Sequence, residues 1–221
     1  MPRIARVVAP GYPHHVIQRG NRRQTTFFRA ADYREYLALM AEWCRAYDVA
    51  IWAYSLMPNH VHLIAVPQSA EGLGKAIGEA HRRYTRYVNF RENWRGHLWQ
   101  GRFASYILDE RYLLTAARYV ELNPVHAGLA KRPELYPWSS AQAHLAGRDD
   151  ALATVAPLLG MVGDWSRFLS QELPGEDLKK LRTHETTGRP LGDESFVSSL
   201  EAALGVSLQK RKPGPVGGHH T

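Results

Sequence analysis

The sequence predicts an α+β fold, and two observations support this prediction. In the first part of the chain, short runs with the composition of strands are interleaved with longer segments whose apolar residues recur at helical spacing. From about Pro133 onward the pattern changes to shorter helices, interrupted by Pro137, Pro157 and Pro174. With 221 residues, of which 44% are hydrophobic, the chain can bury the core of one domain and carry an appendage.

Four segments are expected to form strands. Residues 14–19 alternate weakly and end at a turn, and residues 49–56 are rich in aromatic and β-branched side chains. Residues 60–66 form a similar run, and the tight turn Met57-Pro58-Asn59 joins the two, so they should pair as an antiparallel hairpin. Residues 102–108 alternate like a fourth strand.

Three helices are expected between and after these strands. Asp32 can cap the first, and the second runs from about residue 73 to 90. Asp109 can cap the third, which is expected to end near Asn123 because Pro124 disfavours helical geometry in the residue before it.

The resulting order, β-α-β-β-α-β-α, matches the split β-α-β plan of a ferredoxin-like antiparallel sheet with helices on one face. We assign residues 1–138 to this domain and residues 139–208 to a mainly helical C-terminal appendage that includes an amphipathic helix from about Asp193. Residues 209–221, which are rich in Lys, Arg, Gly and Pro, are expected to form a flexible basic tail.

The charge distribution favours a polyanionic partner such as nucleic acid or an anionic membrane face. The chain carries 28 basic and 21 acidic residues, a net charge of +7 and a pI of about 9.6. No acidic residue occurs before Asp32, whereas six arginines do. A second basic run is interleaved with aromatic residues: Arg82, Arg83, Tyr84, Arg86, Tyr87, Phe90, Arg91, Trp94, Arg95, Trp99 and Arg102. Arginines with aromatics suit single-stranded nucleic acid, although a solvated helix face with its aromatics in the core gives the same pattern.

The composition limits the compartment and the chemistry. The single cysteine, Cys44, excludes an internal disulfide and a cysteine-based zinc site. No stretch is apolar enough to span a bilayer, and the N-terminus lacks the apolar core of a secretory signal. We therefore expect a cytoplasmic, nucleoid-associated protein with no membrane partner.

Two histidines form the first candidate site. On a strand, His60 and His62 point to one face while Val61 points to the other, so the two imidazoles can chelate a divalent cation. The alternative is a pair of partly buried histidines bonded to backbone or water.

Tyr119 and Asn123 form the second candidate site. They are four residues apart and share one face of a helix. A phenol with a pKa of about 10 needs a nearby cation or base to attack at neutral pH. On spacing alone, a core tyrosine and a helix-capping asparagine remain the simpler interpretation.

Three motifs in order resemble those of the single-tyrosine HUH transposases, and specifically their REP-associated branch. They are Met57-Pro58-Asn59-His60-Val61-His62-Leu63, Trp99-Gln100-Gly101-Arg102-Phe103 and the run from Tyr119 to Leu129, YVELNPVHAGL. The resemblance extends from about Tyr12 to Trp138. It implies a nucleophile at Tyr119, a divalent-metal site at His60 and His62, and Asn123 as a residue that completes the metal shell.

The implied activity is the nicking and rejoining of single-stranded DNA through a 5′-phosphotyrosine, with hairpin-forming repeats as the substrate. One departure is His126, which stands where many relatives have arginine or lysine. The cofactor would be Mg²⁺ or Mn²⁺, and imidazole ligands favour Mn²⁺ at least equally. We expect DNA to be bound by Arg19, Asn21, Arg22, Arg23, Arg82, Arg83, Arg86 and Arg102.

Other interpretations remain open at this point. The chain could be an RRM-like module that binds RNA or DNA without cutting it, a catalytically silent descendant that only binds repeats, or a hydrolase that uses metal-bound water. Tyr106 is the second choice for the nucleophile. The protein could be a monomer or a homodimer, although the short linker before the tyrosine helix favours a site built within one chain.

Overall fold

The computed structural model describes residues 6–208. The tail expected at 209–221 lies outside the described residues. Four strands, β1 (His14–Arg19), β2 (Val49–Met57), β3 (His60–Pro67) and β4 (Ala104–Ile107), form one sheet in the order β2-β3-β1-β4, and all neighbours are antiparallel. This is the predicted ferredoxin-like plan, in which β1 and β2 flank β3.

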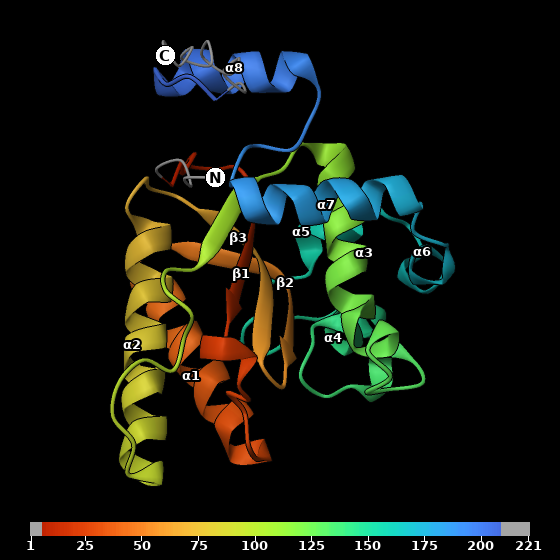
Figure 1. Cartoon of the computed structure of the whole chain (residues 1–221). Coiled ribbons are helices and arrows are strands. Elements are labelled where there is room, and N and C mark those ends of the chain that lie inside the picture. The colour runs from red at the N-terminus through yellow and green to blue at the C-terminus, as the bar shows by residue number, and fades with distance from the viewer. Residues whose placement is uncertain (1–5, 209–221) are drawn as a thin grey trace, which may run out of the picture.

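Helices cover both faces of this sheet (Figure 1). On one face lie α1 (Ala30–Ala46) and α2 (Gly72–Glu92), the two helices that the split β-α-β plan requires. The other face is covered by α3 (Glu110–His126) and by part of the C-terminal segment. The sheet is therefore the middle layer of three.

The C-terminal segment consists of short helices: α4 (Ala141–Ala146), α5 (Ala156–Met161), α6 (Trp165–Ser170), α7 (Gly175–Thr187) and α8 (Glu194–Leu204). Two 3₁₀ turns, η1 (Asn21–Arg23) and η2 (Pro133–Leu135), occur earlier in the chain. Bridges from Ser139 to Ser55, from Ala153 to Ile51 and from Leu191 to Leu108 attach the segment to the sheet. Residues 139–208 thus fold back along the ferredoxin-like unit.

The alternation of side chains along β3 decides which residues enter which layer. Val61 and Leu63 belong to the core beneath α1 and α2, whereas Ile64 belongs to the core beneath α3. By the same alternation, His62 faces α3. The position of the histidine on this face is therefore set by its neighbours in the strand.

Two helix ends differ from the prediction. Helix α1 begins at Ala30, and the Asp32 carboxylate accepts hydrogen bonds from the backbone N–H groups of Phe28 and Arg29 at 2.8 and 3.2 Å. Asp32 is therefore the third helical residue, which caps by reaching backward. Helix α3 continues through Pro124 to His126, because a proline in the last turn removes only one hydrogen bond.

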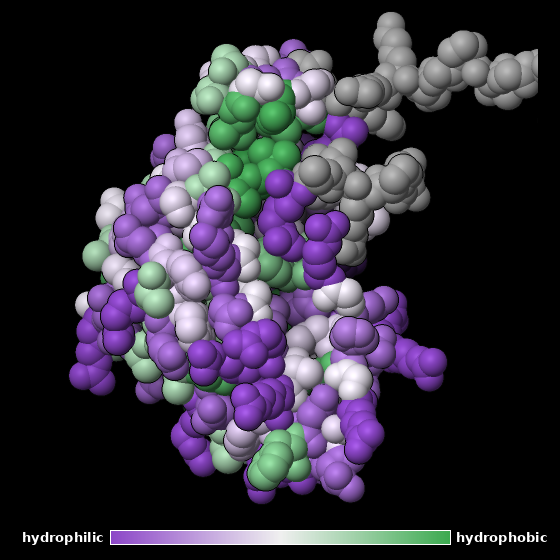
Figure 2. Space-filling model, turned by 90° about the vertical axis from the view of Figure 1, so that its left-hand side faces the viewer, coloured by the Kyte–Doolittle hydropathy of each residue, from purple (hydrophilic) through white to green (hydrophobic). Residues whose placement is uncertain are grey.

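The surface over α1 and α2 is mostly hydrophilic (Figure 2). A hydrophobic patch lies at the end of the molecule near α8, where Phe196 and Leu200 pack with Ile107 and Ala9. Among the described residues, no helix is long and apolar enough to cross a membrane.

Candidate active site

The predicted nucleophile and the predicted histidines meet on the α3 face of the sheet. The rings of His62 and Tyr119 lie 5.5 Å apart, centre to centre, and are almost perpendicular at 85°. His60 and His62 lie 5.0 Å apart. Tyr119 is half-buried. Its ring packs against the histidine rings from the side of α3, and part of the side chain remains accessible to solvent. One chain supplies all three side chains.

The turn before β3 positions His60. The side-chain oxygen of Asn59 lies 2.7 Å from Nδ1 of His60, which leaves Nε2 of this ring for another partner. Burial and the nearby positive charge of Arg19 lower the pKa of His60 to about 4. The imidazole is therefore neutral near pH 7, which is the form that binds metals.

His62 lies in a chain of buried hydrogen bonds. Its Nδ1 lies 3.0 Å from Nε2 of His15, and Nδ1 of His15 lies 2.7 Å from the hydroxyl of Tyr106. The Tyr106 hydroxyl donates to the backbone oxygen of Leu181 on α7 at 3.3 Å. Because a hydroxyl has a single proton, Nδ1 of His15 must then donate to Tyr106, and Nε2 of His15 must accept from His62. This direction leaves Nε2 of His62 unprotonated.

Tyr106 is the second choice for the nucleophile, but its hydroxyl is occupied in this series of hydrogen bonds. It is only 1% exposed, and burial raises its pKa well above the usual value. Its hydroxyl supports His15.

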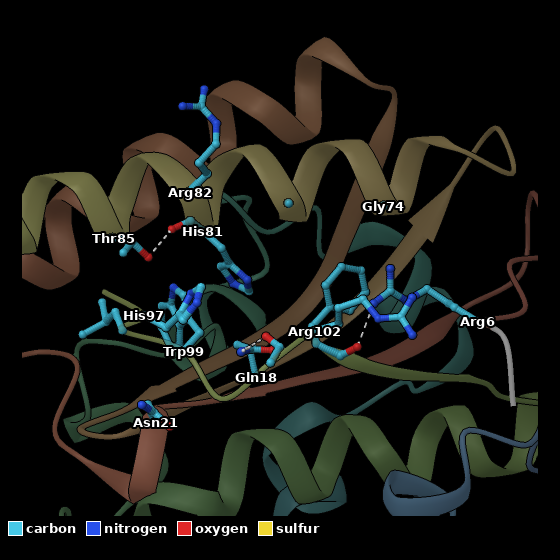
Figure 3. A pocket seen from close by; sticks show the side chains of 14 residues that line it. Arg6, Gln18, Asn21, Gly74, His81, Arg82, Thr85, His97, Trp99 and Arg102 are labelled. Atoms are coloured by element: carbon cyan, nitrogen blue, oxygen red, sulfur yellow. Dashed lines mark hydrogen bonds between the residues drawn. The ribbon is translucent and has the colours of Figure 1, made fainter. Parts of the chain in front are cut away.

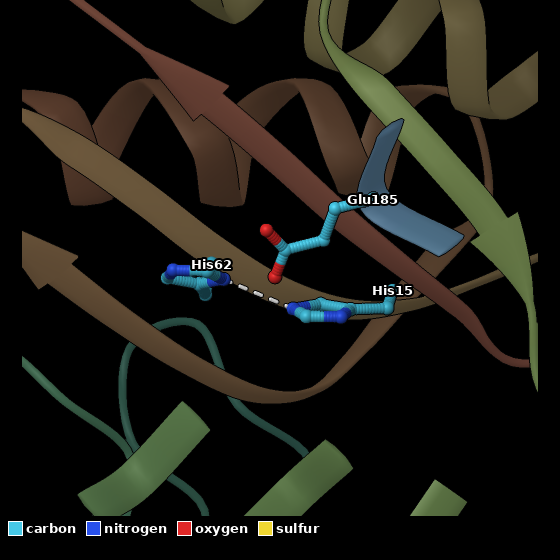
Figure 4. Close-up of side chains that lie close together, drawn as sticks. All are labelled: His15, His62 and Glu185. Carbon is cyan, nitrogen blue, oxygen red and sulfur yellow. Dashed lines mark hydrogen bonds between the residues drawn. The ribbon is translucent and has the colours of Figure 1, made fainter. Parts of the chain in front are cut away.

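A carboxylate from the C-terminal segment completes a cluster that the sequence did not predict (Figure 4). One ligand atom each from His15, His62 and Glu185 of α7 lie within 4.8 Å of one another. Glu185 Oε1 is buried and has no hydrogen-bond partner, and burial raises the pKa of this carboxyl group. Both imidazoles would bind a cation only if it replaced the hydrogen bond between His15 and His62, because a neutral imidazole has a single lone pair. With that bond replaced, the two imidazoles and the unpaired carboxylate oxygen fit the expected divalent metal.

Two further side chains contact Tyr119. Burial and the negative charge of Glu185 raise the pKa of Tyr119, while Arg182 and Asn123 lower it through side-chain hydrogen bonds. Asn123 therefore lies beside the phenol, one helical turn away, as its spacing requires. Arg182 comes from α7, three residues before Glu185, so one face of α7 supplies both charges.

The expected DNA-binding residues separate into groups. Arg19 lies at the end of β1 near the histidines and Glu185. Arg22 and Arg23 are exposed on η1, where the Asn59 amide donates to the Arg23 carbonyl at 3.1 Å. Asn21 and Arg102 line a hollow between α2 and the segment 97–103.

The three arginines of α2 do not point the same way. Arg82 and Arg86 line one shallow hollow at the end of the helix. The Arg83 guanidinium instead lies 4.5 Å from the ring centre of Trp43 on α1. Two of the three thus face the segment that follows α2, and the third packs on the neighbouring helix.

The sequence reasoning missed His15, Arg182 and Glu185. His15 could have been found, because β1 neighbours β3 in a ferredoxin-like sheet and His15 occupies the same face as Ile17. No sequence signal marks Glu185 and Arg182. They lie on a mostly polar helix about 60 residues after Tyr119, and its position relative to the sheet cannot be predicted from spacing.

Comparisons with known proteins identify the family of this chain. The sequence matches the family described as IS200-like transposases over residues 10–123. No curated protein matches the chain.

Two solved structures are similar. The REP-associated tyrosine transposase bound to a REP hairpin is 18% identical, with a TM-score of 0.59 over 70% of this chain and 92% of its own. A transposase of Deinococcus radiodurans R1 is 20% identical, with a TM-score of 0.38 over 55% of this chain and 96% of its own. The first likeness shows the same fold. Since the family match spans more than half of the sequence, this chain belongs to the IS200-like transposase family.

Proposed function

We propose that this protein is a metal-dependent enzyme that nicks and rejoins single-stranded DNA through Tyr119. The observation that carries the proposal is the position of the Tyr119 ring, 5.5 Å from His62 and beside a carboxylate and an arginine from α7. A tyrosine that only filled the hydrophobic core would not need a histidine, a carboxylate and a guanidinium near its ring.

The chemical step is a transesterification. The Tyr119 hydroxyl oxygen forms a bond to phosphorus, and the bond from phosphorus to the 3′ oxygen of the preceding nucleotide breaks. The products are a 5′-phosphotyrosine and a free 3′-hydroxyl, so the reverse reaction with another 3′-hydroxyl joins strands. The phenolic proton must leave during attack, and the Glu185 carboxylate, whose charge acts on Tyr119, is our candidate to receive it.

Charge near Tyr119 would assist the step. The guanidinium of Arg182 stabilises the developing phenolate, because it lowers the pKa of Tyr119. A divalent cation, when bound, supplies positive charge to a non-bridging oxygen of the phosphate.

Two sets of side chains are our candidates to hold that cation. His62 belongs both to the set that the family resemblance implies and to the cluster found in the structure. The first set adds His60 and Asn123, and the second adds His15 and Glu185. Imidazole nitrogens bind Mn²⁺ more readily than Mg²⁺, so we expect Mn²⁺ to support activity at least as well.

The substrate we propose is a DNA hairpin with a single-stranded extension. The structural neighbour was solved with a REP hairpin, and the basic residues of η1 and α2 and at Arg102 can contact phosphates. Such a substrate implies that the protein acts at the nucleoid.

A covalent-trapping experiment tests the proposal. Protein is mixed with labelled hairpins from the DNA flanking its own gene, with Mn²⁺, Mg²⁺ or EDTA, and separated on a denaturing gel. We expect a protein–DNA band that requires metal, single strands and Tyr119. Tyr119→Phe should abolish the band, His60→Ala should weaken it, and Tyr47→Phe, a partly exposed tyrosine at the end of α1, should leave it unchanged. Tight DNA binding without any adduct would instead identify a catalytically silent binding protein.

A further inference from the structure

A hollow on the α2 side of the molecule has no role in the chemistry described above. It lies between α2 and the segment 97–103 and encloses about 590 Å³ (Figure 3). Volumes of this size are typical of ligand sites. Its walls are apolar at Leu98, Trp99 and Phe103.

Two glycines keep the hollow open. Gly74 and Gly78 lie four residues apart on α2 and both line it. Glycine in the interior of a helix destabilises the helix relative to alanine. A Cβ atom on Gly78 would meet nothing within 4 Å, and one on Gly74 would meet only Arg6 Nη1 at 3.9 Å. Packing therefore does not require these glycines, and what they preserve is empty space.

The polar groups in the hollow suit the edge of a planar heterocycle. His81 is buried, its Nε2 lies 2.9 Å from the hydroxyl of Tyr36, and its Nδ1 remains for a ligand. Burial lowers the pKa of His81 to about 3, so the ring is neutral and can donate or accept. The amide nitrogen of Gln18 donates to the Gly101 carbonyl at 3.3 Å, which leaves its oxygen as an acceptor. Both side chains point into the hollow in Figure 3.

The charge at the rim suits a phosphate. Arg82 and Arg102 are exposed and line the hollow, and the Arg82 guanidinium is also paired with Glu79 on the same helix at 2.6 Å. No acidic residue lines it among the residues that the structure describes. Apolar walls, neutral polar groups inside and positive charge outside are the features of a site for a base with its attached phosphate.

A second hollow lies next to the first, on the side of Glu185. This second hollow of about 400 Å³ shares Gln18, Gly101 and Arg102 with the first and extends to Glu185. Glu185 is the carboxylate whose negative charge raises the pKa of Tyr119. A strand that lies along both hollows would run toward Glu185.

We infer that the hollow between α2 and residues 97–103 binds one unpaired nucleotide of the single-stranded extension. This inference rests on the proposed function, since it names a binding site for that substrate. The base lies against the glycine face of α2 and contacts Gln18 and His81, and its phosphate lies at the arginines of the rim.

Gly78→Leu tests the inference, because Gly78 lines the hollow and a Cβ at this position meets no other atom within 4 Å, so the larger side chain can occupy part of the space. The matched control is Gly160→Leu, on α5, where a Cβ also meets nothing within 4 Å and which lines neither hollow. Binding is measured by fluorescence anisotropy with two probes: a hairpin with a six-nucleotide single-stranded tail, and the same hairpin without the tail. Circular dichroism confirms that both variants are folded.

We expect Gly78→Leu to weaken binding of the tailed hairpin roughly tenfold, as the loss of one stacked base does, and to leave the tailless hairpin unchanged. Gly160→Leu should change neither. Equal weakening for both probes would show that the hollow holds the duplex, and unchanged binding for both would show that it holds no nucleotide; either result overturns the inference. Because this readout is binding in EDTA, it is independent of whether Tyr119 forms an adduct, so failure of the proposed function and failure of this site are distinguishable.

Discussion

Nε2 of His15 lies 3.0 Å from Nδ1 of His62, and this contact selects which nitrogen of His62 remains for a metal. From His15, the series of hydrogen bonds continues through Tyr106 to the carbonyl of Leu181. Since the backbone oxygen can only accept, the hydrogen bonds run from His62 outward. Such contacts behind a metal ligand fix its tautomer and orientation.

Removal of the Tyr106 hydroxyl should disturb this tautomer. In the metal-free wild type, ¹⁵N NMR of the histidine side chains should show His62 protonated on Nδ1. In Tyr106→Phe we expect a mixture of tautomers and a 10- to 100-fold loss of Mn²⁺ affinity, measured by electron paramagnetic resonance, because outer partners of metal ligands have effects of about that size. Tyr47→Phe serves as the control. Protonation of wild-type His62 on Nε2 would contradict the direction assigned to the hydrogen bonds from His62 to Leu181.

Replacement of Glu185 by glutamine should change both the metal site and the tyrosine. The negative charge of Glu185 raises the pKa of Tyr119, so Glu185→Gln should lower that pKa in an ultraviolet titration, read as the difference from the same variant carrying Tyr119→Phe. Loss of a carboxylate ligand should also weaken Mn²⁺ binding at least tenfold, by a rough estimate. Glu176→Gln, an exposed position on the same helix, should have neither effect. A Tyr119 pKa that rises in Glu185→Gln would show that the two side chains do not interact as described.

A buried carboxylate joins the tyrosine helix to the C-terminal segment. Glu121 accepts hydrogen bonds from Ser140 at 2.6 Å and from the Trp165 indole at 2.8 Å, and it pairs with His144 at 2.6 Å. Glu121→Ala leaves these groups buried without a partner and should lower the free energy of unfolding by about 3–5 kcal/mol. Urea denaturation at pH 7 measures it, with the exposed Glu110→Ala on the same helix as the comparison. A loss below about 1 kcal/mol, the size of a typical surface effect, would mean that the segment is held by other contacts.

The Asp32 carboxylate should make stability depend on pH in acid. Burial alone would raise its pKa, but the hydrogen bond from Arg91 and those from the backbone lower it below the ordinary value. Since the folded pKa lies below the unfolded pKa of about 3.9, the contribution of Asp32 is full above that value and is lost as the pH falls through the folded pKa.

Asp32→Asn removes this contribution. The difference in unfolding free energy between wild type and Asp32→Asn should therefore be constant from pH 7 to about pH 5 and should shrink below about pH 4. Urea titrations at several pH values measure it. A difference that grows in acid would show that the carboxyl group is not stabilised by Arg91.

The parts of the fold that the sequence predicts are those decided locally. The strand bounds follow from composition and from the turn Met57-Pro58-Asn59, and the facing of His62 follows from the alternation along β3. Helix ends were predicted less well, because Asp32 and Pro124 each act within a single turn whose exact register depends on tertiary contacts.

The candidate site was predictable to the extent that motifs mark it. His60, His62, Tyr119 and Asn123 lie together because a strand and a helix each place two of them on one face. The charges from α7 could not be predicted, since Glu185 reaches the histidines only through the path of the segment that follows α3. That path is set by contacts such as Glu121 with Trp165, which no spacing rule reveals.

The attachment of α7 to the site has a consequence for biosynthesis. His15, His62 and Tyr119 leave the ribosome before Leu181 and Glu185 have been translated, because the latter follow Tyr119 by about 60 residues. A nascent chain with the tyrosine and both histidines already folded lacks the backbone acceptor of the hydrogen-bond chain and the buried carboxylate. The site therefore reaches its final composition only after α7 has been translated.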